Sequence, residues 1–296
     1  MRILIAGGTG FIGRHLCTFL AGKGYELNVL TRREMTGVEN VHYYRWNMEQ
    51  GFIDPHAFDG VEALINMTGV NIGEKRWTKN RKEEILKSRI ESLELLLKCM
   101  LKAGAKIQVL ISSSAVGYYG AVTTGHIFQE KDEAGTDFLV DVCRRWETEA
   151  LKFGKVADRI VILRKGVVIG KNGGMYQRLK PLARLGINVS LGSGRQYLPW
   201  IGIADLIRLY SYILENKEME GVFNAVADEH ITMNEFSKQL LHSFGRKNVL
   251  PNVPSWMIKF MFGELSEMLL RGSRVSNAKV RASGFRFSCH SISQSL

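Results

Sequence analysis

The sequence predicts an α/β protein whose parallel sheet carries helices on both faces, with a smaller and mostly helical lobe toward its C-terminal end. Three observations predict this doubly wound architecture. Short apolar segments alternate with amphipathic ones from residue 2 onward, which is typical of strands joined by crossover helices. A glycine-rich turn joins the first two segments. After residue 165 the composition changes to glycine-rich loops and short helices.

The first half of the chain supplies the strands of the predicted sheet. Residues 2–6 form a short apolar run that predicts a buried strand, and residues 11–22 place apolar side chains at helical spacing. The same patterns predict the elements that follow, with strands at 26–31, 41–46, 62–66, 107–112 and 159–163 and helices at about 79–102 and 137–153.

The second half is expected to contribute loops and helices rather than further sheet. A Thr-x-x-Glu capping box at Thr232 and Glu235 opens a predicted helix at 233–244, and another helix is expected at 203–215. Glycine-rich loops are expected at 171–174 and 191–195, and short helices from residue 253. The predicted domains are a nucleotide-binding part at 1–165 to which a strand near 222–226 returns, cleft-forming segments at 166–250 and a C-terminal helical domain at 251–296.

Composition limits the classes of protein to which this chain can belong. The formal net charge is +11, but the basic residues are dispersed, which favours a solvated surface beside an anionic cofactor over a nucleic-acid partner. No apolar run is long enough to predict a membrane span or a signal peptide. We therefore expect a cytoplasmic protein, or one of an organelle matrix if a transit segment was removed. A small-molecule substrate is expected, and the oligomeric state is not predicted.

The four cysteines give no sign of a metal site or a disulfide framework. Cys17, Cys99, Cys143 and Cys289 are scattered without paired spacing. We expect all four to be reduced and mostly packed, and we expect no bound metal.

The turn after the first predicted strand has the spacing of a dinucleotide-binding loop. Its sequence is Gly7-Gly8-Thr9-Gly10-Phe11-Ile12-Gly13. The first of three spaced glycines allows a tight turn, the second lets the backbone approach a pyrophosphate, and the third lets the helix pack against the sheet. An ordinary strand-to-helix turn is the alternative. Because strand, turn and helix follow in the required order, the spacing favours a Rossmann domain that binds a dinucleotide.

The end of the second predicted strand indicates which dinucleotide is bound. NAD sites usually place an acidic residue there, whereas this chain has Thr31, Arg32 and Arg33. An arginine can hold a 2′-phosphate through two charge-assisted bonds, and the threonine can add a hydroxyl. Two solvated surface arginines are the alternative, and the nearby Glu34 weakens the pattern. The sequence favours NADP(H) as the cofactor.

Several stretches resemble the extended short-chain dehydrogenase/reductase superfamily. They are the glycine turn at 7–13, Ile-Asn-Met-Thr-Gly at 65–69 and the serines at 112–114. More narrowly, the chain resembles the epimerase family with an NAD-dependent epimerase/dehydratase domain and a C-terminal domain of unknown function. That likeness rests on Arg-Trp-Thr at 76–78, the stretches at 84–89, 164–170 and 192–196, Pro-Trp-Ile at 199–201, and 253–254 through 284–287.

The resemblance implies a set of cofactor contacts. Gly7, Gly10 and Gly13 would cradle the pyrophosphate, and Thr31 and Arg32 would surround the adenosine ribose. The middle of the cofactor would be lined by Met67, Thr68 and Gly69. The family pattern also directs Glu84 and Arg89 of the long helix toward the nucleotide, although an exposed ion pair on the helix face is an equal alternative.

The catalytic pattern of the superfamily is incomplete in this chain. Ser114 stands where the superfamily has its serine, but aligning Glu147 with the usual glutamate puts Leu139 and Cys143 at the positions of the catalytic tyrosine and lysine. A substitute for the missing tyrosine hydroxyl could come from Tyr118 or Tyr119. The catalytic pair that we consider is Ser114 with Tyr118. Simple packing at the strand end is the stronger alternative for both tyrosines. Arg144 could add positive charge and Cys143 could contact the substrate.

Residues of the second half supply a predicted substrate wall. In related epimerases the corresponding regions close over a sugar nucleotide, and here they contain Arg164, Arg195, Gln196, Trp200 and Asp205. Trp200 could instead anchor the two lobes, and Asp205 could cap the helix at 203–215. The helically spaced Trp256, Phe260 and Phe262 are expected to pack, or else to form a partner surface.

Two functions remain open at this point. The first is an NADP(H)-dependent oxidoreductase or epimerase-like enzyme that acts on a small polar substrate, for which a nucleotide-linked molecule is one candidate. The second is a sensor or regulatory protein that binds NADP(H) but has lost the reaction, as the missing tyrosine and lysine indicate. Nucleic-acid binding is a distant third.

Overall fold

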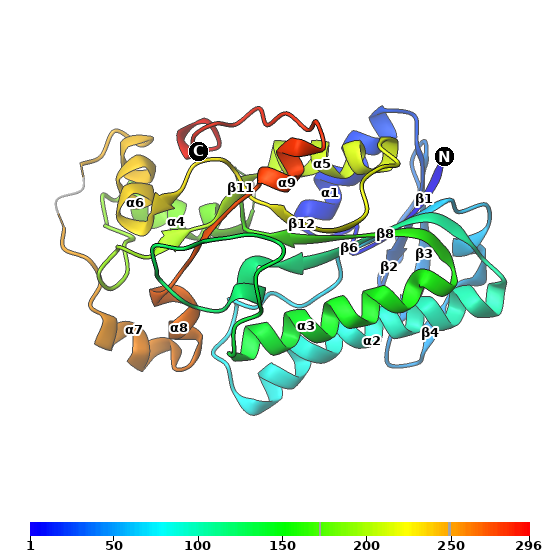
Figure 1. The fold of residues 1–296 in the computed structure, drawn as a ribbon, viewed down its shortest axis with the longest axis horizontal. Helices are drawn as coiled ribbons and strands as arrows, with labels where there is room; N and C mark the ends of the chain where they lie inside the picture. Colours follow the sequence, from blue (N-terminus) through cyan, green and yellow to red (C-terminus); the bar gives the residue numbers. More distant parts are fainter. Residues whose placement is uncertain (172, 248–249) are drawn as a thin grey trace.

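The computed structural model describes residues 1–171, 173–247 and 250–296. An eight-stranded sheet lies at its centre, in the order β12-β8-β6-β5-β1-β2-β3-β4 (Figure 1), and only the β3–β4 pair runs antiparallel. Its strands are β1 (Arg2–Ala6), β2 (Glu26–Thr31), β3 (Val41–Asn47), β4 (Phe52–Ile53), β5 (Ala63–Asn66), β6 (Ile107–Ala115), β8 (Ala157–Lys165) and β12 (Gly221–Ala225). The predicted fold class is confirmed, and β12 is the strand expected to return near residues 222–226.

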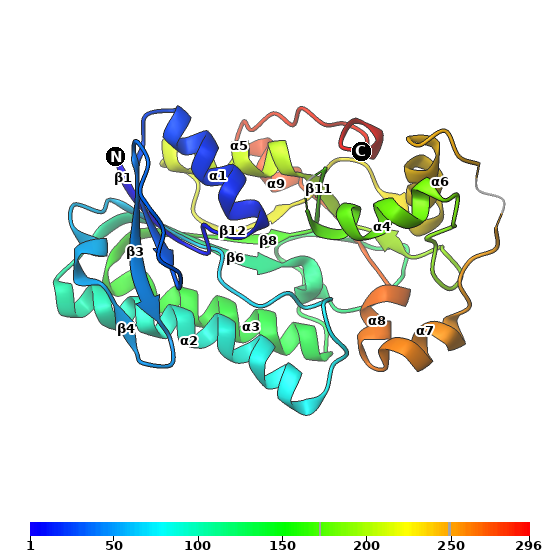
Figure 2. The ribbon, with the colours of Figure 1, turned by 180° about the vertical axis from the view of Figure 1, so that it is seen from behind.

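Helices cover both faces of the sheet, as a doubly wound fold requires. Helices α1 (Phe11–Gly22) and α5 (Ile203–Glu215) lie together on one face, and α2 (Lys79–Ala103) and α3 (Phe138–Leu151) lie on the other (Figures 1 and 2). Each face has its own apolar core. Alternate residues of the central strands enter one core or the other, so that Ile3 and Ile5 pack toward α1 while Leu4 packs toward α2.

Two strands extend further than their apolar runs predict. Strand β6 continues to Ala115 rather than to residue 112, and β8 continues to Lys165 rather than to residue 163. The added residues are mostly polar, but their backbones pair in register, with Ser114 opposite Arg164 and Ala115 opposite Lys165. Because strand alternation sends successive side chains to opposite faces, Arg164 and Lys165 point away from each other. This extension places the polar groups considered below.

The second half of the chain forms the smaller lobe. Its helices are α4 (Gly174–Arg184), α6 (Met233–His242), α7 (Ser255–Phe262), α8 (Leu265–Leu270) and α9 (Ala278–Ala282). Short strand pairs accompany them: β9 (Val167–Gly170) with β11 (Trp200–Gly202), β10 (Tyr197–Leu198) with β13 (Ile231–Thr232), and β7 (Ile127–Phe128) with β14 (Arg274–Val275). The capping box at Thr232 and Glu235 is present as predicted. Asn172, within the predicted loop at 171–174, lies outside the described residues.

The end of the chain packs back onto the nucleotide half. Phe285 and Phe287 are buried in the core between the sheet and α5, where their rings meet edge to face with centroids 5.0 Å apart. Residues beyond 251 therefore complete the core of the first half as well as forming helices. The domain boundaries given above stay a prediction.

Helix α7 does not pack as expected. Trp256 is 68% exposed and Phe260 is 80% exposed, whereas Ile258 is buried and Phe262 contacts the apolar cluster around Trp77. The prediction that the aromatic residues of this helix pack is therefore wrong for Trp256 and Phe260. The apolar contacts of α7 thus involve Ile258 and Phe262, while Trp256 and Phe260 face away from them. No helix within the described parts of the chain is long and apolar enough to cross a membrane.

Candidate functional site

The candidate site lies along the edge of the sheet where the parallel strands end. The strands whose ends adjoin there are, in spatial order, β2, β1, β5, β6 and β8. Neighbouring strands are about 4.8 Å apart, so the edge from β2 to β8 spans roughly 19 Å. In open α/β sheets this edge is where ligands bind. It brings Arg32, Gly7, Met67, Ser113 and Lys165 into one row, although they are far apart in the sequence.

The glycine turn is crowded at two positions and open at the third. A Cβ atom added at Gly7, whose φ is +87°, would lie 2.9 Å from the carbonyl carbon of Met67, and one added at Gly13 would lie 2.3 Å from the Gly7 oxygen. At Gly10 a Cβ would meet only the Gly7 oxygen, at 3.4 Å. Gly10 also caps α1 without a side-chain hydrogen bond, and it is exposed together with Thr9. The turn therefore presents backbone N–H groups at a helix start, which is suited to a phosphate.

Phe11 and Ile12 begin α1 and are both half-buried. The Phe11 ring covers the backbone that follows β9, since a Cβ atom at Gly173 would lie 2.2 Å from it and one at Gly170 would lie 3.1 Å from it. The start of the nucleotide loop is thus packed against the second half of the chain.

The end of β2 offers two arginines to a ligand. Thr31 is buried, and its hydroxyl accepts a hydrogen bond from the Arg33 N–H at 3.1 Å. Arg32 and Arg33 are exposed, and neither forms an ion pair with any residue that the structure describes. Both guanidinium groups are therefore available for a phosphate, while the Thr31 hydroxyl has a local partner. The roles predicted for these residues stay predictions.

The loop after β5 is rigidly held. The Thr68 hydroxyl lies 2.6 Å from Asn66 Oδ1 and 2.7 Å from Ser92 Oγ. Met67 is half-buried, and its N–H donates to the Ala6 carbonyl at 2.8 Å. At Gly69 a Cβ would lie 2.9 Å from Arg89 Cζ. Asn66, Ser92 and Arg89 therefore fix the backbone of this loop at the edge between β1 and β6.

Arg89 and Glu84 do not pair with each other. The Arg89 guanidinium is buried and donates to the carbonyls of Ile85 at 2.9 Å and Val70 at 3.1 Å. Burial lowers the pKa of Arg89 to about 10. Glu84 is paired instead with Arg81 at 2.6 Å. The alternative of an exposed Glu84–Arg89 ion pair is therefore wrong, while their roles toward a nucleotide stay predictions.

Ser114 belongs to a closed network on the α3 face of the sheet. Its hydroxyl donates to Glu147 Oε1 at 2.6 Å, and Arg164 donates to both oxygens of the same carboxylate at 2.8 Å. All three residues are buried. Burial alone would lower the pKa of Arg164, but its bonds to Glu147 and Tyr119 outweigh burial and raise it above the usual value. The network leaves the Ser114 hydroxyl engaged, and its catalytic role stays a prediction.

The two candidate tyrosines differ in their surroundings. The Tyr119 hydroxyl donates to Asn224 Oδ1 at 2.7 Å, and burial raises the pKa of Tyr119 to about 12. Tyr118 is half-buried, and its ring centroid lies 3.3 Å from Arg164 Cζ. Stacking on a guanidinium orients that ring and keeps it against the strand end. Tyr118 is thus the tyrosine whose side chain remains partly accessible.

The positions of the usual catalytic dyad hold apolar residues in the folded protein. Leu139 is 8% exposed and Cys143 is 4% exposed on the packed side of α3. Burial raises the pKa of the Cys143 thiol to about 12, and its sulfur contacts the Ala115 carbonyl at 3.7 Å. All four cysteines are free, as expected. Neither α3 position can therefore supply an acid or base.

Lys165 is the functional candidate that the sequence analysis missed. Its Nζ donates to Ser113 Oγ at 2.8 Å, on the face opposite Arg164. Burial, together with the charge of Arg89, lowers the pKa of Lys165 to about 7. The signal available in the sequence was the alternation of Arg164 and Lys165 beside three serines, which sends one cation of the pair to each face.

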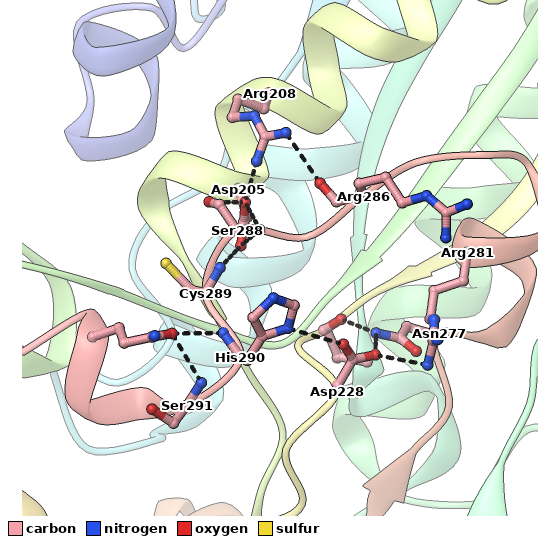
Figure 3. Close-up of polar contacts among 12 residues, drawn as sticks. Asp205, Arg208, Asp228, Asn277, Arg281, Arg286, Ser288, Cys289, His290 and Ser291 are labelled. Atoms are coloured by element: carbon pink, nitrogen blue, oxygen red, sulfur yellow. Dashed lines mark hydrogen bonds and ion pairs between the residues drawn. The ribbon is translucent and has the colours of Figure 1, made fainter.

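The predicted substrate wall is dispersed. Trp200 is fully buried in the core of the second lobe, and Asp205 is 1% exposed. The Asp205 carboxylate accepts from the Ser288 N–H at 2.9 Å, the Ser288 hydroxyl at 2.6 Å and the Cys289 N–H at 2.8 Å (Figure 3). Trp200 and Asp205 therefore hold the fold together and do not line a substrate cleft. Arg195 is exposed, and Gln196 donates to the Leu191 carbonyl.

Comparisons with known proteins extend over the whole chain. A profile of the NAD dependent epimerase/dehydratase family matches residues 3–225, and a profile of a domain of unknown function, DUF1731, matches residues 253–296. Epimerase family protein Mb2239 of Mycobacterium bovis is 35% identical over 295 residues, which cover 99% of this chain and 96% of that protein. These matches confirm the resemblance predicted from the motifs.

Solved structures share the same architecture. The crystal structure of human epimerase family protein SDR39U1 with NADPH has a TM-score of 0.88 at 30% identity, covering 100% of this chain and 97% of that one. A nucleoside-diphosphate sugar epimerase from Corynebacterium glutamicum has a TM-score of 0.78 at 25% identity, covering 100% of this chain and 57% of that one. The C-terminal lobe is included in both matches.

Proposed function

The chain belongs to the NAD dependent epimerase/dehydratase family, and we propose that it is an NADP(H)-dependent oxidoreductase or epimerase-like enzyme acting on a small polar substrate. The glycine turn carries this proposal. It is closed to any side chain at Gly7 and Gly13 yet open at Gly10, where a pyrophosphate would approach the backbone.

The cofactor preference rests on charge. Arg32 and Arg33 stand at the end of β2, where the 2′-position of the adenosine ribose lies in this fold, and no acidic side chain of the described chain neutralises them. A guanidinium holds a phosphate through two parallel bonds. The human relative whose structure contains NADPH supports the same choice.

Residues of this chain would hold the cofactor in the order of the strands. Arg32 would take the 2′-phosphate, Gly10 the pyrophosphate, and Met67 with Gly69 the middle of the molecule. When bound, NADPH supplies a hydride for the reduction of a carbonyl group. Its nicotinamide end would then face the ends of β6 and β8, where Ser113 and Lys165 lie.

The proposed substrate class is supported by one relative and by one exposed arginine of the second half. The Corynebacterium relative is a nucleoside-diphosphate sugar epimerase, and Arg195 is exposed in the loop that leads to β10. A nucleotide-linked carbonyl or sugar is the ligand we favour, since its phosphates would attract such an arginine. We also propose that the enzyme acts in the cytoplasm, a compartment in which free thiols such as its four cysteines persist.

A second candidate function is favoured by one observation. The usual tyrosine and lysine positions are Leu139 and Cys143, both buried. A protein that binds NADP(H) as a signal, and performs no reaction, would tolerate that replacement. A spectroscopic screen for NADPH oxidation across carbonyl and sugar-nucleotide substrates separates the two functions, because the sensor gives no signal with any of them.

Calorimetric titration with NADPH and NADH tests the cofactor assignment first. We expect wild type to prefer NADPH and Arg32→Ala to lose that preference. Arg145→Ala is the matched control, since Arg145 is an exposed arginine of α3, paired with Asp141 on the outer face of that helix. No binding of either nucleotide by wild type would overturn the proposed function.

A further inference from the structure

Lys165 ends β8 at the part of the sheet edge where the nicotinamide would lie. Its strand is next to β6, and its Nζ donates to Ser113 Oγ at 2.8 Å. The residue as a whole is half-buried. Ser113 in turn lies 3.2 Å from the hydroxyl of Tyr210 on α5. The three polar groups form a short chain from the edge of the sheet into its interior.

No carboxylate neutralises this amine among the residues that the structure describes. Arg89 from α2 is the charged group whose field acts on it, Tyr210 from α5 lies behind Ser113, and the Arg164–Glu147 pair lies on the opposite face of the sheet. Glu147 is already bound by Arg164 and Ser114. Arg89 carries a positive charge that disfavours a second one nearby. Lys165 is therefore a cation without a counterion.

We propose that Lys165 is the catalytic residue that transfers a proton to and from the substrate oxygen, with Ser113 holding its Nζ in position. The inference rests on the proposed function. It accounts for the missing dyad, because Leu139 and Cys143 cannot perform this transfer and the Ser114 hydroxyl is engaged by Glu147. The pKa of Lys165, about 7, agrees with this role. A group transfers protons most efficiently when its pKa lies near the pH at which the enzyme works.

Proton transfer by Lys165 can run in both directions of the reaction. In carbonyl reduction, an N–H bond of the Lys165 ammonium breaks and an O–H bond forms on the substrate, while the hydride that forms the C–H bond comes from the nicotinamide cofactor of the proposed function. The neutral amine then takes a proton from water. In alcohol oxidation the neutral amine would accept the hydroxyl proton, and the oxidised nicotinamide cofactor of the proposed function would accept the hydride. The Ser113 hydroxyl can accept from the ammonium or donate to the neutral amine, with Tyr210 as its other partner.

The test measures the titration of the amine itself and needs no substrate. Protein labelled with ¹³C and ¹⁵N in lysine is titrated by NMR, and the Lys165 signal is assigned by its loss in Lys165→Arg. We expect this signal to titrate near pH 7, whereas ordinary lysines titrate at about pH 10.4. Titration of Lys165 above pH 9 would overturn the inference.

Two ligands then locate the amine along the site. NADPH should shift the Lys165 signal, whereas adenosine 2′,5′-bisphosphate, which lacks the nicotinamide, should leave it unchanged. Lys102 at the end of α2 is the control signal for both. Equal effects of the two ligands, or none from bound NADPH, would overturn the assignment of Lys165. Absence of NADPH binding, measured by calorimetry on the same sample, would instead overturn the proposed function.

Lys165→Arg keeps the positive charge and a donor to Ser113, but arginine does not release a proton near neutral pH. We expect this variant to bind NADPH as wild type does and to lose turnover of any substrate found in the screen. Residual turnover with an unchanged pH profile would show that Lys165 has only a structural role.

Discussion

Arg164 and Lys165 are consecutive cations at the end of one strand, yet the fold treats them in opposite ways. Arg164 lies on the α3 face, where Glu147 binds it through two bonds of 2.8 Å. Lys165 lies on the α5 face, where a serine hydroxyl is its hydrogen-bond partner. Accordingly the pKa of the arginine is raised and that of the lysine is lowered. In this pair the cation bound by a carboxylate is structural, and the one without a carboxylate is the one that we propose exchanges its proton.

The same distinction extends along the site. Arg32 at the end of β2 resembles Lys165 in forming no ion pair within the described residues, but it is exposed and keeps its hydration. The cations that we assign to ligand and reaction are thus the ones that the fold leaves without a counterion. Four substitutions test this contrast.

The largest effect is expected from Glu147→Gln, which turns Arg164 into a buried cation without a counterion. We expect the free energy of unfolding to fall by about 3–5 kcal/mol, because the uncompensated charge remains inside the protein. Urea unfolding measures this loss. The control is Asp141→Asn, which removes an exposed pair on the same helix and should cost about 0.3–0.5 kcal/mol. Similar losses in both variants would contradict the structural role of Glu147.

Asp205→Asn removes a carboxylate that is buried more deeply than Glu147, and whose partners include neutral groups of Ser288 and Cys289 as well as Arg208. We expect a loss of about 2–3 kcal/mol, since a charged acceptor is replaced by an amide that must also bury its own donors. Thermal unfolding measures it. The comparison variant is Arg208→Met, which removes the arginine but keeps the neutral donors. If it lowers the free energy of unfolding as much as Asp205→Asn does, Asp205 depends on its arginine as Glu147 does, and the two sites do not differ.

Arg32→Ala tests a cation available to a ligand. Removing one charge-assisted contact with a phosphate costs about 1.5–3 kcal/mol, so NADPH affinity should fall roughly ten- to a hundredfold. NADH affinity and the free energy of unfolding should not change. Calorimetry and urea unfolding of the same sample check both statements. A large loss of stability would show that Arg32 is structural, as Arg164 is.

The smallest effect is the pH dependence of Lys165→Met. The folded pKa of Lys165, about 7, lies below the value of an unfolded lysine, so above pH 7 the unfolded chain binds more protons than the folded one. Wild type should therefore gain stability relative to Lys165→Met as pH rises, by at most about 1.4 kcal/mol per pH unit. Urea unfolding at pH 6.5, 7.5 and 8.5 measures this gain. Lys155→Met, which removes an exposed lysine before β8, should show no such trend.

The nucleotide half was largely predictable because its signals are local. The spacing of Gly7, Gly10 and Gly13 reflects a turn made by adjacent residues, and apolar alternation identifies each central strand. The ends of β6 and β8 were not predictable in this way. Their last residues are polar, so periodicity ends before the strand does. What keeps Arg164 and Lys165 in the sheet is a partner strand and distant acceptors that sequence spacing does not reveal.

The misplaced substrate wall has a related cause. Trp200 and Asp205 have the residue types of a ligand site, but their burial depends on segments far away in the sequence, such as Ser288 and Cys289. The exposure of Trp256 likewise depends on which neighbours a short helix has. Arg32 and Arg33 differ from them, because both are exposed at the end of β2, and their predicted role toward a phosphate stays a prediction.

The bonds from Ser288 and Cys289 to Asp205 constrain the order in which a nascent chain can fold (Figure 3). Helix α5 carries both Asp205 and Tyr210, the partner of Ser113. The strands of the central sheet lie between residues 2 and 225, whereas the bonds that hold Asp205 come from residues 288 and 289. The start of α5 therefore gains this anchor only after a segment 84 positions further along the chain has been made.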